Sequence, residues 1–379
     1  MSATATTCRS SPERPGLTST ELEPRFLLFG HDTIECSYYA KAVPGCSIDF
    51  DQLGALRESL RVDRQREARE VELFGESFLL QPYGSSTGYP FVLCCQRGTI
   101  SCGPQNVPMF HVKWNSGALW REGIRALHGW FLAWLERAGF EIERPETLSR
   151  VDATFDYFLP AVDFDSDSFV SLSTKDAQYR ADRVVQTFDF GRGDVKLRVY
   201  NKVAEICEQS PEKAWFFDLW GISEKVWRIE WQVRKDVLRR FAIRTVESLL
   251  QQQGDMLRYL ADEHDSLRVR TTDSNRSRWP RHRLWVDLQA QIDQLPSIGI
   301  YRDLAKGAGI EERLQQIAFS VYGSYKQIAA IAQLQGNGKR VSLPQAMRRV
   351  DLRIRAIHDT LDWDADVERR TAKLRHAPQ

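Results

Sequence analysis

The chain has 379 residues, with 52 basic and 51 acidic side chains and a formal net charge of +1. A chain of this length has room for two or three domains, and its hydrophobic fraction of 42% is enough for a core, which excludes wholesale disorder. Because the net charge is close to zero, no global field marks a nucleic acid, a membrane or an acidic partner. Any nucleic-acid site must therefore come from local clusters of charge.

No segment of the sequence has the composition of an export signal or a membrane anchor. No apolar run approaches the roughly 20 residues that span a bilayer. The first 16 residues are rich in Ser, Thr and Pro and lack the apolar stretch of a secretory signal. The seven cysteines include no CxxC pair, which argues against a disulfide framework and a cysteine zinc site. We expect a soluble, cytoplasmic protein that does not bind membranes.

The first third of the chain predicts a flexible leader, residues 1–24, followed by an α+β segment, residues 25–140. Apolar spacing indicates strands over 27–36 and 107–114, a helix over 48–60, and β-hairpins punctuated by glycines over 71–99. One long helix should start at Asn115 and Ser116, present its aromatic side chains to the core at steps of three and four residues, and end at Gly139.

From Glu141 to Val237 the apolar period is two, which predicts strands with turns at Pro160, at 191–193 and at 210–211. Helical spacing dominates after Val246, with an arginine-rich loop over 268–283 and a break at 336–338. The pattern favours an α+β fold, in which an antiparallel sheet with packed helices forms the core. We divide this core into the halves 25–140 and 141–290, and assign 291–379 to a helical accessory region.

Three strands of the middle segment alternate apolar and polar side chains, so each has one face for a core and one polar face. The polar faces carry Arg150, Asp152, Thr154 and Asp156 on the first strand, Lys196, Arg198, Tyr200 and Lys202 on the second, and Arg228, Glu230, Gln232 and Arg234 on the third. If these strands share a sheet, one surface collects carboxylates, cations and a tyrosine. The alternative is a half-exposed sheet whose solvent face carries ordinary cross-strand ion pairs.

The polar surface has the residue types of a phosphodiester-cleaving site. Carboxylate oxygens from Asp152, Asp156 and Glu230 are the ligands that Mg²⁺ or Mn²⁺ prefers. A tyrosine beside cations and such an ion is able to attack a phosphodiester. Residues four apart on a strand are about 13 Å apart at roughly 3.3 Å per residue. Only one of the two aspartates should therefore share an ion with Glu230, and we favour Asp156.

At these residues the sequence resembles the replication initiation factor family of rolling-circle plasmids, filamentous phages and conjugative elements. The resemblance runs in order through the strand 109–114 and the helix after it, Gly139-Phe140, the strand 149–156, the segment 197–202 with Glu205 behind it, and 227–230. The stretch 275–280 looks like the phage and integrative-element branch of that family. The resemblance covers about 105–290 well, the N-terminal third weakly and the tail hardly at all.

The resemblance implies that Tyr200 attacks DNA and becomes linked to the 5′-phosphate. It also implies that the carboxylates at Asp152, Asp156 and Glu230 support a divalent cation. The sequence departs from the pattern at Gln232, where some plasmid relatives carry a second glutamate. Beside the nucleophile we place the cations Arg198 and Lys202. No two histidines form a His-hydrophobe-His pair, which argues against the histidine-based class of rolling-circle nickases.

Several basic and aromatic residues are candidates for DNA contacts. Arginines neutralise phosphates, and an indole stacks on an unpaired base. The alternative for the loop 268–283 is a solvated loop anchored by buried tryptophans. Tyr322 and Tyr325, three apart on a predicted helix, are more simply explained by helix packing than as nucleophiles. The predicted DNA-binding residues are Lys196, Arg234, Lys235, Arg276, Arg278, Trp279 and Arg281.

The sequence thus favours a metal-dependent, site-specific single-strand endonuclease and ligase that starts rolling-circle replication. The predicted partner is origin DNA, single-stranded or extruded as a hairpin. No GxxxxGK[ST] motif is present, so unwinding should need a separate host helicase. A conjugative relaxase of the same chemistry, a non-catalytic origin-binding protein and a homodimeric assembly remain open alternatives, as do the origin sequence and the type of genetic element.

Overall fold

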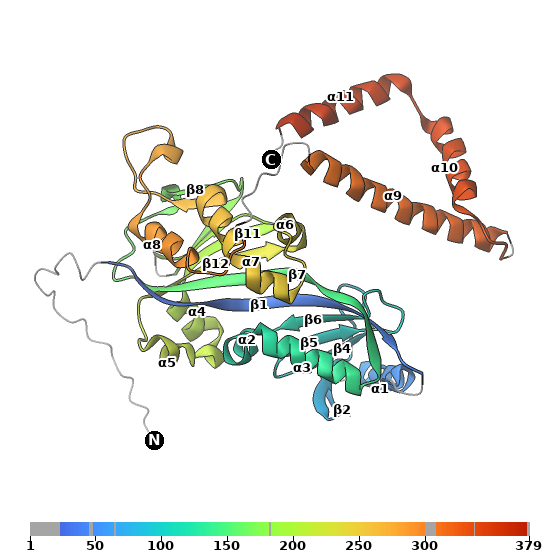
Figure 1. Ribbon diagram of the computed structural model, residues 1–379, viewed down its shortest axis with the longest axis horizontal. Coiled ribbons are helices and arrows are strands. Elements are labelled where there is room, and N and C mark those ends of the chain that lie inside the picture. The colour runs from blue at the N-terminus through green and yellow to red at the C-terminus, as the bar shows by residue number, and fades with distance from the viewer. Residues whose placement is uncertain are drawn as a thin grey trace, which may run out of the picture. The chain divides into compact units, whose positions relative to one another are not determined.

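The computed structural model describes residues 23–44, 48–63, 66–181, 183–299, 308–336 and 338–376. The predicted leader, 1–24, is thus almost wholly outside the described residues. The chain divides into two compact units, Met1–Ile300 and Tyr301–Gln379, each of which is described by itself (Figure 1). We expected the helical region to start at 291, but this division comes after the helix that contains residue 291.

An antiparallel sheet of eleven described strands forms the first unit, which confirms the predicted α+β fold. In spatial order the strands are β2 (Arg69–Leu73), β3 (Glu76–Leu80), β4 (Phe91–Cys95), β5 (Gly98–Cys102), β6 (Phe110–Trp114), β1 (Arg25–Ala42), β7 (Phe140–Phe158), β12 (Val226–Arg234), β11 (Val195–Asn201), β10 (Val184–Phe190) and β9 (Asp176–Ala181). A small second sheet pairs β8 (Phe169–Ser171) with β13 (Asp265–Leu267). The two longest strands, β1 and β7, pair along almost their whole length at the centre of the large sheet (Figure 1).

The three strands whose polar faces the sequence singled out are neighbours in the order β7-β12-β11. Glu230 on β12 is paired with Thr154 on β7 and with Arg198 on β11. Because paired residues on adjacent strands point to the same side of a sheet, the three polar faces form one surface. This surface is covered rather than half-exposed, since Asp152, Asp156 and Glu230 are all buried.

The helices of the first unit connect the strands and cover the sheet. They are α1 (Phe50–Val62), α2 (Ser116–Glu122), α3 (Ile124–Arg137), α4 (Lys202–Gln209), α5 (Phe216–Trp220), α6 (Lys235–Arg240), α7 (Val246–Tyr259) and α8 (Arg283–Ile292). Short turns of other helix types cover Ser166–Ser168, Pro211–Lys213, Leu260–His264 and Arg276–Arg278.

The long helix predicted to run from Ser116 to Gly139 is two helices. Gly123, with φ of 78° and ψ of 154°, separates α2 from α3 because this left-handed, extended conformation cannot continue a helix. The predicted cap is confirmed, since the Asn115 side chain accepts a hydrogen bond from the Ala118 amide at 2.9 Å. The break turns Trp120 away from the aromatic stripe of α3 and against Phe216 of α5, with ring centroids 5.2 Å apart.

Different helices pack on the two faces of the central strands. On the apolar face, Trp231 packs against Trp285 of α8, with centroids 5.7 Å apart, and the Tyr157 hydroxyl donates to Asp287 of α8 at 2.8 Å. On the polar face, α2 and α5 meet in the Trp120–Phe216 contact, and α4 follows directly from β11. The helices α2, α4 and α5 therefore enclose the polar side chains of the three central strands.

The second unit consists of helices α9 (Ala308–Gln335), α10 (Leu343–Ile357) and α11 (Thr360–His376). The helix α9 ends at Gln335, next to the predicted break, and a capping box between Ser342 and Gln345 starts α10. Its described side chains form little core: Ala332 and Ala346 are buried, while Val321, Ile354 and many other apolar residues are exposed. Among the described residues, no helix has the length and apolarity needed to cross a bilayer.

Candidate active site

Tyr200 lies at the end of β11, one residue before the chain turns into α4. The Asn201 side chain caps α4 by accepting a hydrogen bond from the Ala204 amide at 3.1 Å. This junction fixes Tyr200 on the polar face of the sheet and places Lys202 in the first turn of the helix beside it. The Lys202 ammonium lies 5.6 Å from the centre of the Tyr200 ring. The strand-to-helix turn therefore holds a phenol and a cation together.

The Tyr200 hydroxyl donates a hydrogen bond to Oε2 of Glu230 at 2.9 Å. The other Glu230 oxygen, Oε1, accepts from the Arg198 guanidinium. Glu230 is 1% exposed and Tyr200 is 7% exposed. Burial, followed by the negative charge of Glu230, raises the pKa of Tyr200 well above its ordinary value. The phenol is therefore neutral, and its proton already points at a carboxylate that is able to accept it.

Beside this pair, Asp156 belongs to a buried ionic network. Both of its oxygens accept from Arg228, at 2.6 and 2.8 Å, and Oδ2 also accepts from the Trp220 indole at 2.9 Å. Arg228 reaches further to Asp32 on β1, at 2.8 Å. Burial raises the pKa of Asp32, but the charges of Arg228, Lys202 and Lys213 and a hydrogen bond from Ser116 together hold this pKa below its ordinary value. Asp32, Arg228 and Asp156 thus tie β1, β12 and β7 together.

This network changes the expectation that Asp156 shares a metal ion with Glu230. Three hydrogen-bond donors already contact the two oxygens of Asp156, so this side chain stabilises the fold. The spacing of residues along one strand could not show these partners. Asp152 accepts from Arg150 at 2.8 Å. Burial raises the pKa of Asp152 to about 6; Arg150 opposes this rise, and the charge of Glu230 adds to it. Asp152 is therefore close enough to Glu230 for the charge of Glu230 to raise the pKa of Asp152.

As these side chains are arranged, the carboxylate oxygens of Asp152 and Glu230 are not free to bind a metal ion. The oxygens of Glu230 are bonded to Arg198 and Tyr200, and those of Asp152 are bonded to Arg150. Among the residues that the structure describes, no three His, Cys, Asp or Glu side chains are grouped to hold a metal ion. A divalent cation would have to displace a cation or a hydroxyl from these carboxylates. Mg²⁺ or Mn²⁺ stays a prediction.

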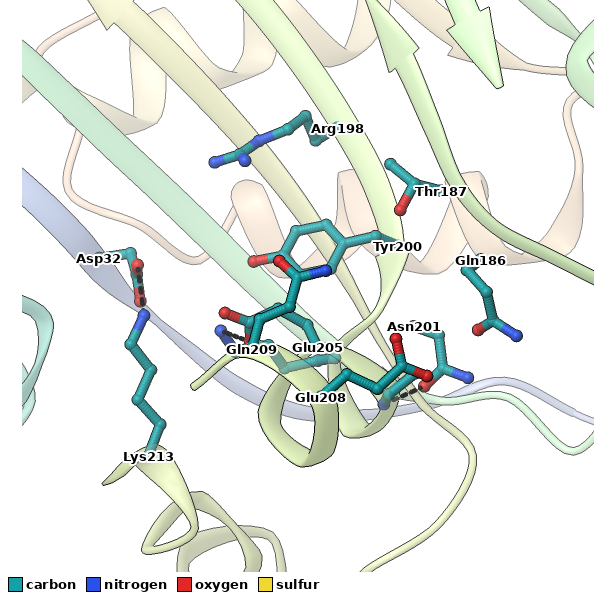
Figure 2. A pocket seen from close by; sticks show the side chains of 12 residues that line it. Asp32, Gln186, Thr187, Arg198, Tyr200, Asn201, Glu205, Glu208, Gln209 and Lys213 are labelled. Carbon is teal, nitrogen blue, oxygen red and sulfur yellow. Dashed lines mark hydrogen bonds and ion pairs between the residues drawn. The ribbon is translucent and has the colours of Figure 1, made fainter. Parts of the chain in front are cut away.

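A cavity of about 270 Å³ opens beside Tyr200, and Figure 2 shows the side chains that surround it. Lys202 lines this cavity and forms an ion pair with Glu205 at 2.6 Å. Burial, together with the charge of Arg228, lowers the pKa of Lys202. Lys213 also lines the cavity, and its ammonium is 3.6 Å from Asp32. The wall of this cavity therefore combines a phenol with three cations, Arg198, Lys202 and Lys213.

Sequence reasoning did not find Lys213 or Asp32. Asp32 lies in the first strand, far from the other site residues in the chain, and Lys213 lies in the turn between α4 and α5. Their role depends on the pairing of β1 with β7, which brings Asp32 to Arg228. The one usable signal was that a lone aspartate interrupts the apolar pattern of β1. No local pattern marked Lys213.

The predicted DNA-binding residues lie outside this cavity. Lys196 pairs with Asp189 at 2.8 Å, and Arg234 and Lys235 occupy the junction of β12 and α6. In the basic loop, Arg276 donates to the backbone carbonyls of Asp167 and Phe169, and Arg281 pairs with Asp262. Arg278 is exposed.

Trp279 differs from the expectation of a stacking platform. Its side chain is 6% exposed, and its indole donates to the Asp273 carbonyl at 2.7 Å. The ring therefore anchors its own loop, as in the alternative explanation of this segment.

No protein-family model matches the chain, and no curated protein matches it. The chain is similar to the rolling circle replication initiator protein from Geobacillus stearothermophilus, with 19% identity over 72% of this chain and 97% of that one and a TM-score of 0.40.

Proposed function

We propose that this protein nicks and rejoins single-stranded DNA at a specific site through a 5′-phosphotyrosine intermediate on Tyr200, and that this reaction initiates rolling-circle replication. The observation that carries the proposal is the 2.9 Å hydrogen bond from Tyr200 to the buried Glu230, beside a cavity whose lining includes Arg198, Lys202 and Lys213. The ordered sequence resemblance through the same three strands supports it. A nucleophile held by a base is the arrangement that covalent catalysis needs.

In the proposed reaction the Tyr200 oxygen attacks the scissile phosphorus, and a P–O bond to the tyrosine forms as the P–O3′ bond breaks. The phenolic proton passes to Glu230, and the departing 3′ oxygen takes up a proton to leave a free 3′-hydroxyl. Arg198 and Lys202 would stabilise the negative charge that grows on the phosphoryl group, and Lys213 is a third cation on the wall of the cavity. Attack by the 3′-hydroxyl on the phosphotyrosine reverses these steps and rejoins the strand.

Burial keeps the Tyr200 hydroxyl protonated until DNA binds. The pKa of Tyr200 is well above its ordinary value in the free protein, so the phenolate is absent. A bound phosphodiester brings negative charge that engages Arg198, and a weaker Arg198–Glu230 pair leaves Glu230 freer to accept the proton. The carboxylate oxygens that would hold a metal ion are occupied by other partners in this structure.

The test is Tyr200→Phe, which removes only the hydroxyl. The variant should fold, lose the one hydrogen bond to Glu230 at a cost of about 1 kcal/mol, and form no denaturation-resistant adduct with a single-stranded origin oligonucleotide. Tyr179→Phe is the matched control, because Tyr179 is 56% exposed on the edge strand β9. Repeating the wild-type assay with a chelator, and then with added Mg²⁺ or Mn²⁺, tests the predicted ion.

Three results would contradict the proposal in whole or in part. An adduct formed by Tyr200→Phe would exclude Tyr200 as the nucleophile and direct the assay to Tyr322 and Tyr325 on α9. Tight DNA binding by a wild-type protein that forms no adduct would favour the non-catalytic origin-binding protein. Nicking of a transfer origin in preference to a replication origin would identify the conjugative relaxase of the same chemistry.

A further inference from the structure

The helices α9 and α10 of the second unit each carry an apolar stripe with a heptad repeat. Steps of three and four residues alternate along both helices, and Ser324 is the polar member of the stripe. On α9 the a and d positions are Leu314, Ile317, Val321, Ser324, Ile328 and Ile331. On α10 they are Leu343, Met347, Val350, Ile354 and Ile357. This spacing is typical of helices that pack side by side in a coiled coil or bundle. We call the two stripes together the heptad seam.

Much of the heptad seam is open to solvent. On α9, Leu314, Ile317 and Ile331 are 58%, 57% and 56% exposed. On α10, Met347 and Ile354 are 46% and 50% exposed. A row of large apolar side chains that stays exposed along two helices marks a surface for a protein contact.

The second unit has too little core to hold its helices together alone. Among its described side chains, the buried apolar ones are the alanines Ala332 and Ala346. Isolated helices are marginal in water, and most helical stability in proteins comes from the packing of an apolar face. Two small side chains supply little such packing. The helices α9 and α10 therefore need a further surface against the heptad seam.

The α9 part of the heptad seam carries no charge. From Leu314 to Gln335 the sequence has one charged residue, Lys326. Lys326 holds the f position, opposite to the seam, and its ammonium lies 4.6 Å from the centre of the Tyr322 ring. Two copies of this helix are thus able to approach each other without repulsion between like charges. A polyanion such as DNA would find no cation on this stripe.

The repeat also limits what kind of surface is able to cover the seam. Side chains at a and d positions fit into holes between residues of a facing helix, so the partner should be a helix with the same repeat. The main helices of the first unit already bury their apolar faces. Phe131 and Trp134 of α3 and Trp285 and Leu288 of α8 are fully buried. Within the described part of the chain, the exposed heptad repeat is that of α9 and α10, so the matching surface is the same seam on a second copy.

We infer that two copies of this chain associate through the heptad seam, with α9 and α10 of one copy against α9 and α10 of the other. Isoleucine at d, as at Ile317 and Ile331, together with Leu or Ile at a, favours bundles of more than two helices, and two copies supply four. The inference is independent of the proposed function, because the second unit contains neither Tyr200 nor Glu230. Each dimer would carry two first units, each with its own Tyr200.

The experiment measures the mass of the full chain by light scattering during size-exclusion chromatography. The wild type should have twice the 43.7 kDa mass of one chain. Val321→Glu puts a charge at an a position and should return the mass to that of one chain, because the association would bury carboxylates without partners. Tyr322→Glu is the matched control. Tyr322 is 47% exposed and Val321 is 44% exposed, but Tyr322 holds the b position outside the seam, and a glutamate there is able to pair with Lys326. This control should stay dimeric.

A second variant tests the other half of the seam. Ile354→Glu on α10 should also give the mass of one chain. Thermal unfolding of the first unit should be the same in both seam variants as in the wild type, which separates lost association from general misfolding. A wild type with the mass of one chain at every concentration, a dimer that survives both seam variants, or equal dissociation of Val321→Glu and Tyr322→Glu would overturn the inference. The adduct assay on Tyr200 decides the proposed function separately.

Discussion

At the scale of single residues, the site is defined by which charges have partners. Arg228 is fully buried between Asp156 and Asp32, and Lys202 is buried beside Glu205. Lys213 differs from both, since its ammonium is 3.6 Å from Asp32 and its side chain is 21% exposed. A cation with one long contact is the one best able to turn to an incoming anion. We therefore expect Lys213 to hold the phosphate next to the scissile bond.

Lys213→Met tests that role. The variant keeps most of the apolar stem and loses the charge, so the KM for nicking of an origin oligonucleotide should rise about tenfold, as expected for one lost charge-assisted contact. Lys41→Met is the control, because Lys41 forms an exposed pair with Glu141 at the end of β1. A neutral methylphosphonate at the contacted position should remove the difference between wild type and Lys213→Met. Equal KM values on the normal oligonucleotide would exclude the contact.

The two aspartates of β7 should differ in what they contribute to folding. Asp156→Asn takes the charge from a pair in which both partners are fully buried, and should lower the free energy of unfolding by about 3 kcal/mol. Asp152→Asn should leave stability unchanged or raise it, because burial and the charge of Glu230 already raise the pKa of Asp152 and disfavour its ionised form. Urea unfolding of both variants measures the difference. A larger loss for Asp152→Asn would show that the Arg228 network is not the main support of these strands.

At the scale of secondary-structure elements, the cover over the polar face depends on how closely α2 approaches β1. A Cβ on Gly30 would lie 2.6 Å from the ring of Trp120, closer than any normal contact. Trp120 packs on Phe216 of α5 and beneath the Arg228 guanidinium, so the ring has little freedom to move aside. The absence of a side chain at Gly30 is therefore what allows α2 and α5 to close over the site.

Gly30→Ala should destabilise the first unit by about 2 kcal/mol, the usual cost of one extra carbon in a packed core. The melting temperature should fall by several degrees. Gly129→Ala is the control: Gly129 is exposed within α3, and a Cβ there would meet nothing within 4 Å. This control should be neutral or slightly stabilising, because alanine is the better helix former. A stable Gly30→Ala variant would mean that Trp120 moves freely, and α2 would not be a fixed cover.

At the scale of the whole molecule, stability should depend on pH through a histidine in the central sheet. His31 lies on β1, and burial lowers its pKa from 6.5 to about 4. Between these values the unfolded chain binds a proton that the folded chain does not, so stability is present above pH 6.5 and is lost as the pH falls toward 4. The loss should approach about 1.4 kcal/mol per pH unit, or about 3 kcal/mol in total.

Denaturant unfolding at pH 7, 6 and 5 measures this dependence. His31→Gln carries no titrating group and should show a flatter curve over the same range. The difference between the two curves isolates His31 from the carboxylates, which titrate in both proteins. Parallel curves would show that His31 is protonated in the folded protein or that its ring is not buried.

Much of the fold was predictable because its elements have local signals. Alternating side chains marked β7, β11 and β12, glycines marked the hairpins from β2 to β5, and Asn115 marked the start of α2. Helix continuity through Gly123 was predicted wrongly. The apolar spacing runs across that residue, but the positive φ of Gly123 interrupts the helix, and spacing does not report a single φ angle.

The sequence by itself determined that three strands carry polar faces with Tyr200, Glu230 and the aspartates, because side-chain direction along a strand depends only on the local period. The tertiary structure alone decided which of these groups meet. The register of β11 on β12 joins Tyr200 to Glu230, the pairing of β1 with β7 brings Asp32 to Arg228, and the turn before α5 adds Lys213. Burial also turned Trp279 into a loop anchor. The physical reason is that hydrogen bonds, ion pairs and exposure depend on distances between segments remote in the chain, and no local pattern encodes those distances.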